Sequence, residues 1–309
     1  MAINLKELSK QGDFLTSGHR ACAGCGPAIA LRQALLAAGK DTVVANATGC
    51  MEVVTTIFPY TAWKVPWIHS LFENAAATIS GVEAAYKALK RKGKISKDIN
   101  FIAFGGDGGT YDIGLQALSG TMERGHNILY ICYDNEAYMN TGIQRSGATP
   151  YGAHTTTSPA GKEIPGKTQW RKDLTEIIAA HDIPYVAQAT ISEWRDYMGK
   201  VQKALSFKGP KFINVLAPCQ LGWYYKSEDT IKIANLAYRT RFWPLYEVEN
   251  GVHRITKEPK KAVPVEEWLK LQGRFRHLFK DGNKKIIEKI QERVDKRWKR
   301  LKALEEASL

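Results

Sequence analysis

The sequence lacks the features of membrane, secreted and disulfide-rich proteins. It has no run of about 18 apolar residues, so no transmembrane helix is expected. Residues 1–10 carry three charged side chains and no apolar core of a secretory signal, which predicts a cytoplasmic location. The five cysteines are an odd number, which argues against a disulfide framework in such a chain.

No recognisable nucleic-acid-binding motif accompanies the basic charge of the chain. Its 44 Lys and Arg outnumber 31 Asp and Glu, giving a formal charge of +13. The excess is concentrated in residues 90–97 and toward the C-terminus rather than along one motif. We therefore expect no nucleic-acid partner, and favour docking to an acidic protein.

Strand-like and helix-like segments alternate along the first two thirds of the chain. This alternation predicts an α/β fold with a mostly parallel sheet and helices on both faces. Expected strands are 42–47, 102–104, 128–132, 185–187 and 212–216; expected helices are 28–38, 72–91, 113–124, 174–181 and 192–205. In segments 53–72 and 141–167 the hydrophobic residues recur with no clear helical or strand spacing. We interpret these segments as ordered loops over a site.

After Trp223 the sequence is rich in aromatic and charged residues, and its hydrophobic periodicity is weaker. We expect residues 1–223 to form the cofactor-binding domain and residues 224–309 a C-terminal extension. Near its end, apolar residues recur at spacings of three and four, which predicts an amphipathic helix over 283–304: Ile287, Ile290, Val294, Trp298 and Leu301. This helix is expected to pack on the domain or on a partner; binding to a membrane surface is the minor alternative.

Two polar residues follow consecutive predicted strands. Asp107 lies between Gly106 and Gly108, and Asn135 follows the next strand along the chain. The carboxyl ends of parallel strands share one edge, so both side chains are expected there. With a backbone carbonyl they would supply the hard oxygen ligands of Mg²⁺ beside a diphosphate. The alternative is an ordinary turn and a helix cap.

Four of the five cysteines lie in glycine-rich or proline-bounded loops. Cys22 and Cys25 form a Cys-x-x-Cys pair, whereas Cys50 and Cys219 each follow a predicted strand. Four converging thiolates would suit a structural zinc ion or a four-iron cluster, and four unrelated thiols remain the alternative. Cys132 lies within an apolar strand and is interpreted as a core residue.

These motifs together resemble the β subunits of the 2-oxoacid:ferredoxin oxidoreductases, most closely those acting on pyruvate. The Gly-Asp-Gly and Asn pattern is the family's thiamine diphosphate fingerprint. The matching stretches span residues 15–250 in the family's order: Gly18–Cys22, Asn46–Cys50, Gly105–Gly114, Tyr133–Gly142 and Leu216–Cys219.

The resemblance implies three bound groups. Thiamine diphosphate would be held through Mg²⁺ on Asp107, Asn135 and the carbonyl of Ala137. One [4Fe–4S] cluster would have as ligands Cys22, Cys25, Cys50 and Cys219. Asn140 resembles the family's residue near the reacting thiazolium. Further residues expected to contact the cofactor, with Cys50 again among them, are Gly49, Glu52, Gly106, Gly108, Gly109 and Thr141.

The resemblance also implies a reaction and partners. A 2-oxoacid, pyruvate in the first place, would be oxidatively decarboxylated, with coenzyme A taking the acyl group and ferredoxin the electrons. One partner subunit would supply the aminopyrimidine-binding domain and another further clusters, so the isolated chain is expected to be inactive. Oxalate and branched-chain 2-oxoacids are the alternative substrates, because the family's substrate contacts come largely from the partner subunit. Gln220-Leu221 also stands where the family commonly has Pro-Thr, a departure that bears on the substrate. The remoter alternatives are another thiamine enzyme and a non-enzymatic zinc-binding module.

Overall fold

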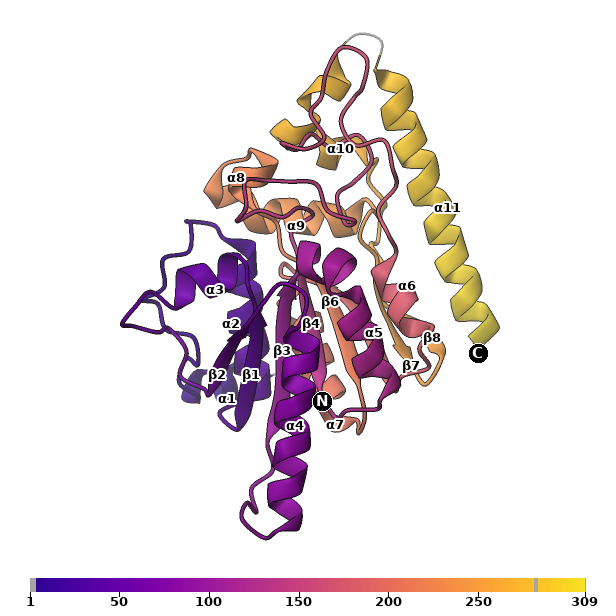
Figure 1. Cartoon of the computed structure of the whole chain (residues 1–309). Coiled ribbons are helices and arrows are strands. Elements are labelled where there is room, and N and C mark those ends of the chain that lie inside the picture. Colours follow the sequence, from indigo (N-terminus) through magenta and orange to yellow (C-terminus); the bar gives the residue numbers. More distant parts are fainter. Residues whose placement is uncertain (1–3, 281–282, 309) are drawn as a thin grey trace.

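One eight-stranded sheet forms the centre of the computed structural model, which describes residues 4–280 and 283–308 (Figure 1). The strand order is β2-β1-β3-β4-β6-β5-β7-β8; β1 to β6 are parallel and the last two antiparallel. The strands are β1 (Thr42–Ala47), β2 (Trp67–Ser70), β3 (Asn100–Gly106), β4 (Leu129–Asp134), β5 (Tyr185–Thr190), β6 (Lys211–Leu216), β7 (Leu245–Glu249) and β8 (Val252–Lys257).

Helices cover both faces of the sheet, as the sequence predicted. On one face α2 (Gly26–Ala38) and α7 (Trp194–Ser206) pack together against the inner strands, around the buried side chains of Leu31 and Val201. On the other face lie α4 (Ala75–Arg91), α5 (Leu115–Glu123) and α6 (Leu174–Ala179). The fold is therefore the expected α/β layer structure.

The strand order places four site-bearing strands side by side. Strands β1, β3, β4 and β6 are neighbours, all parallel, so their carboxyl ends open onto one stretch of the sheet edge. Such an edge is where open α/β sheets bind ligands. Asp107, Asn135, Cys50 and Cys219 each follow one of these four strands, which explains how residues far apart in sequence converge.

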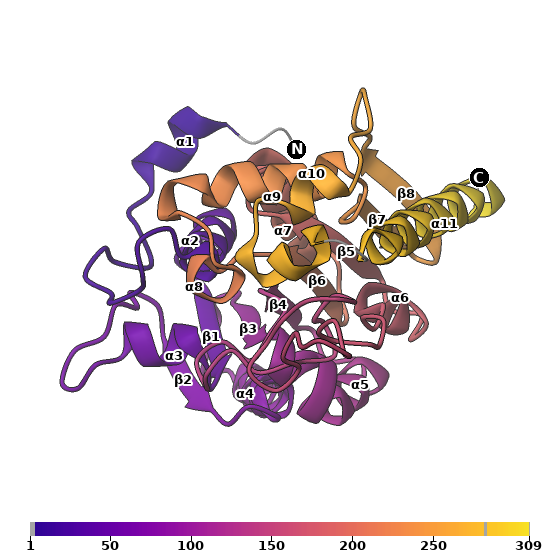
Figure 2. The same ribbon diagram turned by 90° about the horizontal axis from the view of Figure 1, so that it is seen from above.

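Short helices and loops gather beyond this edge (Figures 1 and 2). They are α3 (Cys50–Thr55), α8 (Gln220–Trp223), α9 (Thr230–Arg239), α10 (Glu266–Leu269), the π-helical turn Gly109–Ile113 and the 3-10 turns Ser227–Asp229 and Gly273–Phe279. Three fully buried tryptophans, Trp223, Trp243 and Trp268, centre a hydrophobic core that holds most of this cap together. The cap thus rests on aromatic packing.

The C-terminal segment continues the same sheet. β7 pairs with β5, and β8 completes the hairpin. Helix α11 (Lys284–Ser308) then packs along β8, and its predicted apolar stripe is buried: Ile287, Ile290, Val294, Trp298 and Leu301. The helix prediction is confirmed and its apolar face is used within the chain. The domain boundary at Trp223 stays a prediction.

Two loop predictions had different outcomes. Segment 53–72 was expected to be a loop, but it contains the end of α3 and the edge strand β2, whose backbone pairs with β1. Segment 141–167 holds neither helix nor strand, as expected. Helix α1 (Leu5–Lys10) lies near the N-terminus. Among the described residues no helix has the length and apolarity needed to cross a membrane.

Candidate active site

A pocket opens at the carboxyl edge between β1, β3 and β4. It is formed by strand-end loops and by the segment after β4, and its lining is Thr48, Gly49, Cys50, Phe72, Gly106, Gly108, Gly109, Tyr133, Asn135, Ala137, Tyr138, Met139, Asn140 and Thr141. Most residues predicted to contact the cofactor therefore meet in one pocket. The pattern had not indicated Thr48, Phe72, Tyr133, Tyr138 or Met139, because nothing in their spacing distinguishes them from core residues.

The Asp107 carboxylate, the Asn135 side-chain amide and the Ala137 carbonyl converge beside this pocket. In the amide orientation that satisfies its neighbours, Asn135 Nδ2 donates to Asp107 Oδ1 at 2.9 Å and to the carbonyl oxygen of Ala137 at 2.8 Å. With a cation between these groups, the amide would instead turn its oxygen toward the cation. Asp107 and Asn135 are brought together as the sequence predicted.

The donor set of these residues is that of a hard cation. The separations of 2.9 and 2.8 Å are those of amide hydrogen bonds, and they bring the three groups near enough to share one ion. One carboxylate, one amide oxygen and one backbone carbonyl are ligands that Mg²⁺ prefers. The three residues therefore fit Mg²⁺ in their donor chemistry.

Asp107 is held in place by its neighbours. Its side chain is fully buried. Oδ1 accepts a hydrogen bond from the main-chain N–H of Asn135 at 3.2 Å, and Oδ2 accepts one from Ser146 Oγ at 2.5 Å. Burial, and then the neighbouring Asp134, raise the pKa of its carboxyl well above the ordinary value. A bound cation would offset the free-energy cost of ionising this buried carboxyl. Ser146 lies 39 residues away in a loop, so no sequence pattern identified it.

The glycines beside Asp107 are required by close packing. A Cβ at Gly108 would lie 2.3 Å from Cδ1 of Tyr138, and one at Gly109 would lie 2.7 Å from the Phe72 carbonyl oxygen. Side chains at these positions would displace the pocket wall. The main chain at these two glycines is therefore open to close approach by a phosphate, as expected for a glycine-rich strand-to-helix turn.

The four loop cysteines come from three places that touch one another. Cys25 is the N-cap of α2, Cys50 begins α3, and Cys219 is the N-cap of α8. The next residue, Gly26, donates its N–H to the Pro218 carbonyl at 3.1 Å, which joins the first cysteine loop to the last. Cys22 precedes them on an exposed loop, and its carbonyl accepts from the Cys25 N–H at 3.1 Å.

The thiols influence one another electrostatically. Burial, and then the other thiols, raise the pKa of Cys50 to about 12; burial likewise raises the pKa of Cys25 to about 12, with Cys219 and Cys22 adding to it. Burial also raises the pKa of Cys219. Thiolates here need compensating positive charge, as bound iron or zinc supplies.

Across the described ranges 4–280 and 283–308, no three His, Cys, Asp or Glu side chains are grouped as for a single metal ion. In a four-iron cluster each cysteine binds a different iron, so its thiolates stand further apart than around one zinc ion. Four cysteine thiolates are a donor set that suits either a [4Fe–4S] cluster or a zinc ion.

A buried ion network lies behind Asn135. Glu136, which is fully buried and has a positive φ of 65°, pairs with Arg274 at 2.5 Å and with Arg171 at 2.7 Å. Arg171 also pairs with Asp134 at 2.6 Å. Arg274 stacks over the Trp223 ring at 3.8 Å. The network holds the loop after β4; its arginines lie far along the chain, so spacing could not reveal it.

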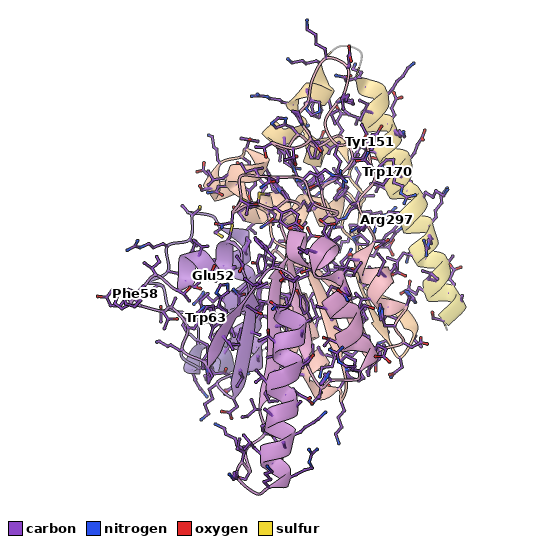
Figure 3. All side chains as sticks on the ribbon, in the orientation of Figure 1. Glu52, Phe58, Trp63, Tyr151, Trp170 and Arg297 are labelled. Carbon is purple, nitrogen blue, oxygen red and sulfur yellow. The ribbon has the colours of Figure 1, made fainter. Side chains whose placement is uncertain are left out.

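Glu52 was predicted to be a cofactor neighbour, but it does not line the pocket. It lies on α3, where its Oε1 is 4.0 Å from His69 Nδ1 (Figure 3). His19 and His154 each accept a nearby backbone N–H through Nδ1. These histidines therefore have local structural partners.

The chain matches known proteins over this whole region. The family described as thiamine pyrophosphate enzyme, C-terminal TPP binding domain, matches residues 47–215. Pyruvate synthase subunit PorB of Methanocaldococcus jannaschii is 62% identical, over 94% of this chain and 96% of its own length. The PorB of Thermotoga maritima is 55% identical, over 100% of this chain and 98% of its own.

The chain belongs to the β subunits of the 2-oxoacid:ferredoxin oxidoreductases. It is an oxidoreductase subunit with a thiamine diphosphate-binding domain, as the motifs had indicated. This β subunit is also 47% identical to the ketoisovalerate oxidoreductase subunit VorB of Pyrococcus abyssi, over 94% of the chain and 93% of VorB. A 2-oxoglutarate:ferredoxin oxidoreductase from Magnetococcus marinus shares the fold, with a TM-score of 0.55, 20% identity and coverage of 67% and 66%.

Proposed function

We propose that this β subunit holds the diphosphate of thiamine diphosphate through Mg²⁺, carries one [4Fe–4S] cluster, and acts in a pyruvate:ferredoxin oxidoreductase. The observation that carries the proposal is the convergence of the Asp107 carboxylate, the Asn135 side-chain amide and the Ala137 carbonyl. The names of two similar relatives, both pyruvate synthase PorB subunits, favour pyruvate as the 2-oxoacid.

The chain's own residues bind and orient in this proposal. Asp107, Asn135 and the Ala137 carbonyl would hold Mg²⁺, and the backbone at Gly108 and Gly109 would face the diphosphate. When bound, thiamine diphosphate supplies the electron sink for decarboxylation of a 2-oxoacid. Asn140, exposed at the rim of the pocket, would position the substrate side of the cofactor, with Thr141 beside it.

The cluster would be the first electron acceptor. Cys50 lines the cofactor pocket itself, so a cluster on Cys22, Cys25, Cys50 and Cys219 would stand next to thiamine diphosphate. A site for single electrons is what oxidation of a decarboxylated 2-oxoacid requires before coenzyme A accepts the acyl group. Electrons would leave through further clusters on a partner subunit to ferredoxin.

A partner subunit would complete the thiamine site. Large apolar side chains are exposed around the pocket side of the sheet: Val53, Phe58, Tyr60, Ile68, Leu71 and Ile113. Phe58 is 94% exposed at the tip of a projecting loop (Figure 3). An apolar surface of this kind suits a permanent protein interface. We propose that the aminopyrimidine-binding subunit docks here.

Cysteine variants test the cluster. Cys50→Ser should lower iron and acid-labile sulfide in the anaerobically purified complex and remove the visible absorption of the cluster. Cys132→Ser is the matched control, because this buried cysteine lies within β4 and should leave iron content unchanged. Equal iron in both variants, or zinc in place of iron, would refute the cluster. Turnover by the isolated chain would refute the need for a partner.

A branched-chain substrate is the second candidate. It is favoured by the 47% identity to a ketoisovalerate oxidoreductase subunit. The complex should be assayed on a panel of pyruvate, 2-oxoisovalerate and oxalate, with and without coenzyme A. A higher kcat/KM for 2-oxoisovalerate than for pyruvate would replace the pyruvate assignment. The same assay, run against ionic strength, tests docking of an acidic ferredoxin: a flat response would contradict electrostatic steering.

A further inference from the structure

Tyr133 stands between the two proposed sites. It lies on β4 beside Gly106 in the sheet register, and a Cβ on that glycine would be 3.1 Å from Cε2 of the tyrosine ring. A Cβ on Gly49 would be 3.1 Å from the Tyr133 hydroxyl oxygen. The ring edge therefore faces the diphosphate loop, and the hydroxyl faces the turn that begins Cys50.

The hydroxyl of Tyr133 has no partner. The side chain is 1% exposed, and its oxygen is completely buried without a hydrogen bond within the described residues. A buried hydroxyl almost always has a partner, because leaving it unpaired costs free energy. The neighbouring tyrosine on the same strand, Tyr130, follows this rule: its hydroxyl lies 3.0 Å from Thr110 Oγ1.

The surroundings point to sulfur as the missing partner. Tyr133 belongs to the hydrophobic cluster against which Cys25 and Cys50 pack, and both Tyr133 and Cys50 line the pocket. Burial raises the pKa of Tyr133. Of the neighbouring titratable groups, the Cys50 thiol adds most to this rise. The hydroxyl thus faces the turn that carries a proposed cluster ligand, because Gly49 directly precedes Cys50.

We infer that the Tyr133 hydroxyl donates a hydrogen bond to the Cys50 thiolate or an adjacent sulfide of the bound cluster, and so raises its reduction potential. This inference rests on the proposed function, since it requires the cluster. A donated hydrogen bond stabilises the reduced cluster more than the oxidised one, because reduction adds negative charge to the sulfurs. Tyr133 acts as a positioning and tuning residue.

The test is a redox titration followed by electron paramagnetic resonance of the reduced cluster in the full-length chain, loaded anaerobically. Tyr133→Phe removes only the hydroxyl. We expect a threefold to tenfold drop in the equilibrium constant for cluster reduction; tenfold corresponds to about 59 mV for one electron. A matched control is Tyr130→Phe, whose hydroxyl already has a partner on the opposite face of the sheet; it should leave the potential unchanged.

A second substitution works in the opposite direction. Incorporating 3-fluorotyrosine at position 133 keeps the shape and strengthens the donor, so the potential should rise. This comparison remains informative if the phenylalanine variant loads poorly. Binding of thiamine diphosphate with Mg²⁺ is measured on the same samples.

Each outcome is decisive. Opposite shifts in the two Tyr133 variants, with Tyr130→Phe unchanged, support the inference. An unchanged potential in loaded Tyr133 variants overturns it while the proposed function stands. A change in thiamine diphosphate affinity alone would assign the hydroxyl to the cofactor and also overturn it. A wild-type chain that takes up no iron would overturn both the inference and the proposed cluster.

Discussion

The indole N–H of Trp223 donates to the main-chain carbonyl of Asn135 at 2.7 Å. Trp223 ends the short helix that begins after Cys219, and the side-chain amide of Asn135 is one of the three converging groups. The bond therefore joins the last cysteine loop directly to the proposed Mg²⁺ loop. Both partners are buried, so the two loops are held at a fixed separation.

Removing the charge of Asp107 should abolish cofactor binding without unfolding the chain. Asp107→Asn keeps the size of the side chain but loses an anionic ligand. We expect Mg²⁺-dependent affinity for thiamine diphosphate to fall by more than about 100-fold, since even changes to residues that only hydrogen-bond to a metal ligand cost about 10–100-fold. Calorimetric titration of the complex measures it. Asp98→Asn, at a side chain that is 94% exposed, is the control; equal affinities would contradict the Mg²⁺ assignment.

Breaking the buried Arg274–Glu136 pair should destabilise the chain. Arg274→Met leaves Glu136 with Arg171 alone, and removing one partner of a buried pair costs about 3–5 kcal/mol in the free energy of unfolding. Urea denaturation measures the loss. The double variant Glu136→Gln, Arg274→Met should recover part of it, because no unpaired charge then remains. A loss below about 1 kcal/mol, typical of an exposed pair, would contradict this prediction.

Lys167 should make stability rise with pH in the alkaline range. Burial, and then Arg145 and Arg171, lower its pKa from 10.5 to about 8, and its Nζ donates only to the carbonyls of Ser146 and Thr149. Between these pH values the unfolded chain holds a proton that the folded chain has lost, so folding becomes more favourable as pH rises.

The Lys167→Met variant isolates this effect. The free energy of unfolding of the wild type minus that of the variant should increase between pH 8 and pH 10. Lys211→Met is the matched comparison, since burial also lowers the pKa of Lys211 to about 8 at a different site, beside Asn127. A wild-type minus Lys167→Met difference that stays constant with pH would show that Lys167 does not titrate there.

The exposed loop around Phe58 should contribute to assembly. Phe58→Ser removes a ring that is 94% exposed, so the fold of the isolated chain should not change. If the ring is a central interface residue, its loss should weaken binding of the partner subunit by about 2 kcal/mol or more. Surface plasmon resonance measures this affinity. Ile231→Ser, on α9, removes a 46% exposed side chain as the control; equal losses in the two variants would contradict a specific role.

Local pattern was sufficient to predict the main elements and the motif residues. Strand β1 and helix α7 lie within two residues of their expected bounds because buried runs and 3.6-residue periodicity are properties of the local sequence. Asp107 and Asn135 could be placed together because each directly follows a buried strand. The carboxyl ends of neighbouring parallel strands lie at one edge of the sheet, which brings the two residues together.

Contacts across long sequence separations could not be predicted. Ser146 hydrogen-bonds to Asp107, and Arg274 to Glu136. Both donors come from segments whose sequence shows no helical or strand periodicity. Strand β2 was missed because four residues at a sheet edge carry almost no pattern, and its position depends on pairing with β1. Glu52 was expected at the cofactor because it follows Cys50 closely. Its carboxylate lies 4.0 Å from His69 and does not line the pocket, and its contact with the cofactor stays a prediction.

The hydrogen bond from Gly26 to Pro218 has a consequence for how the protein is made. The contact joins the first cysteine loop to a loop that lies 192 residues further along the chain. A ribosome must therefore release more than two thirds of the polypeptide before all four thiols can meet. Iron delivered earlier would find only a partial set of ligands, so loading of the proposed cluster belongs after synthesis of β6 and Cys219, when all six parallel strands are present.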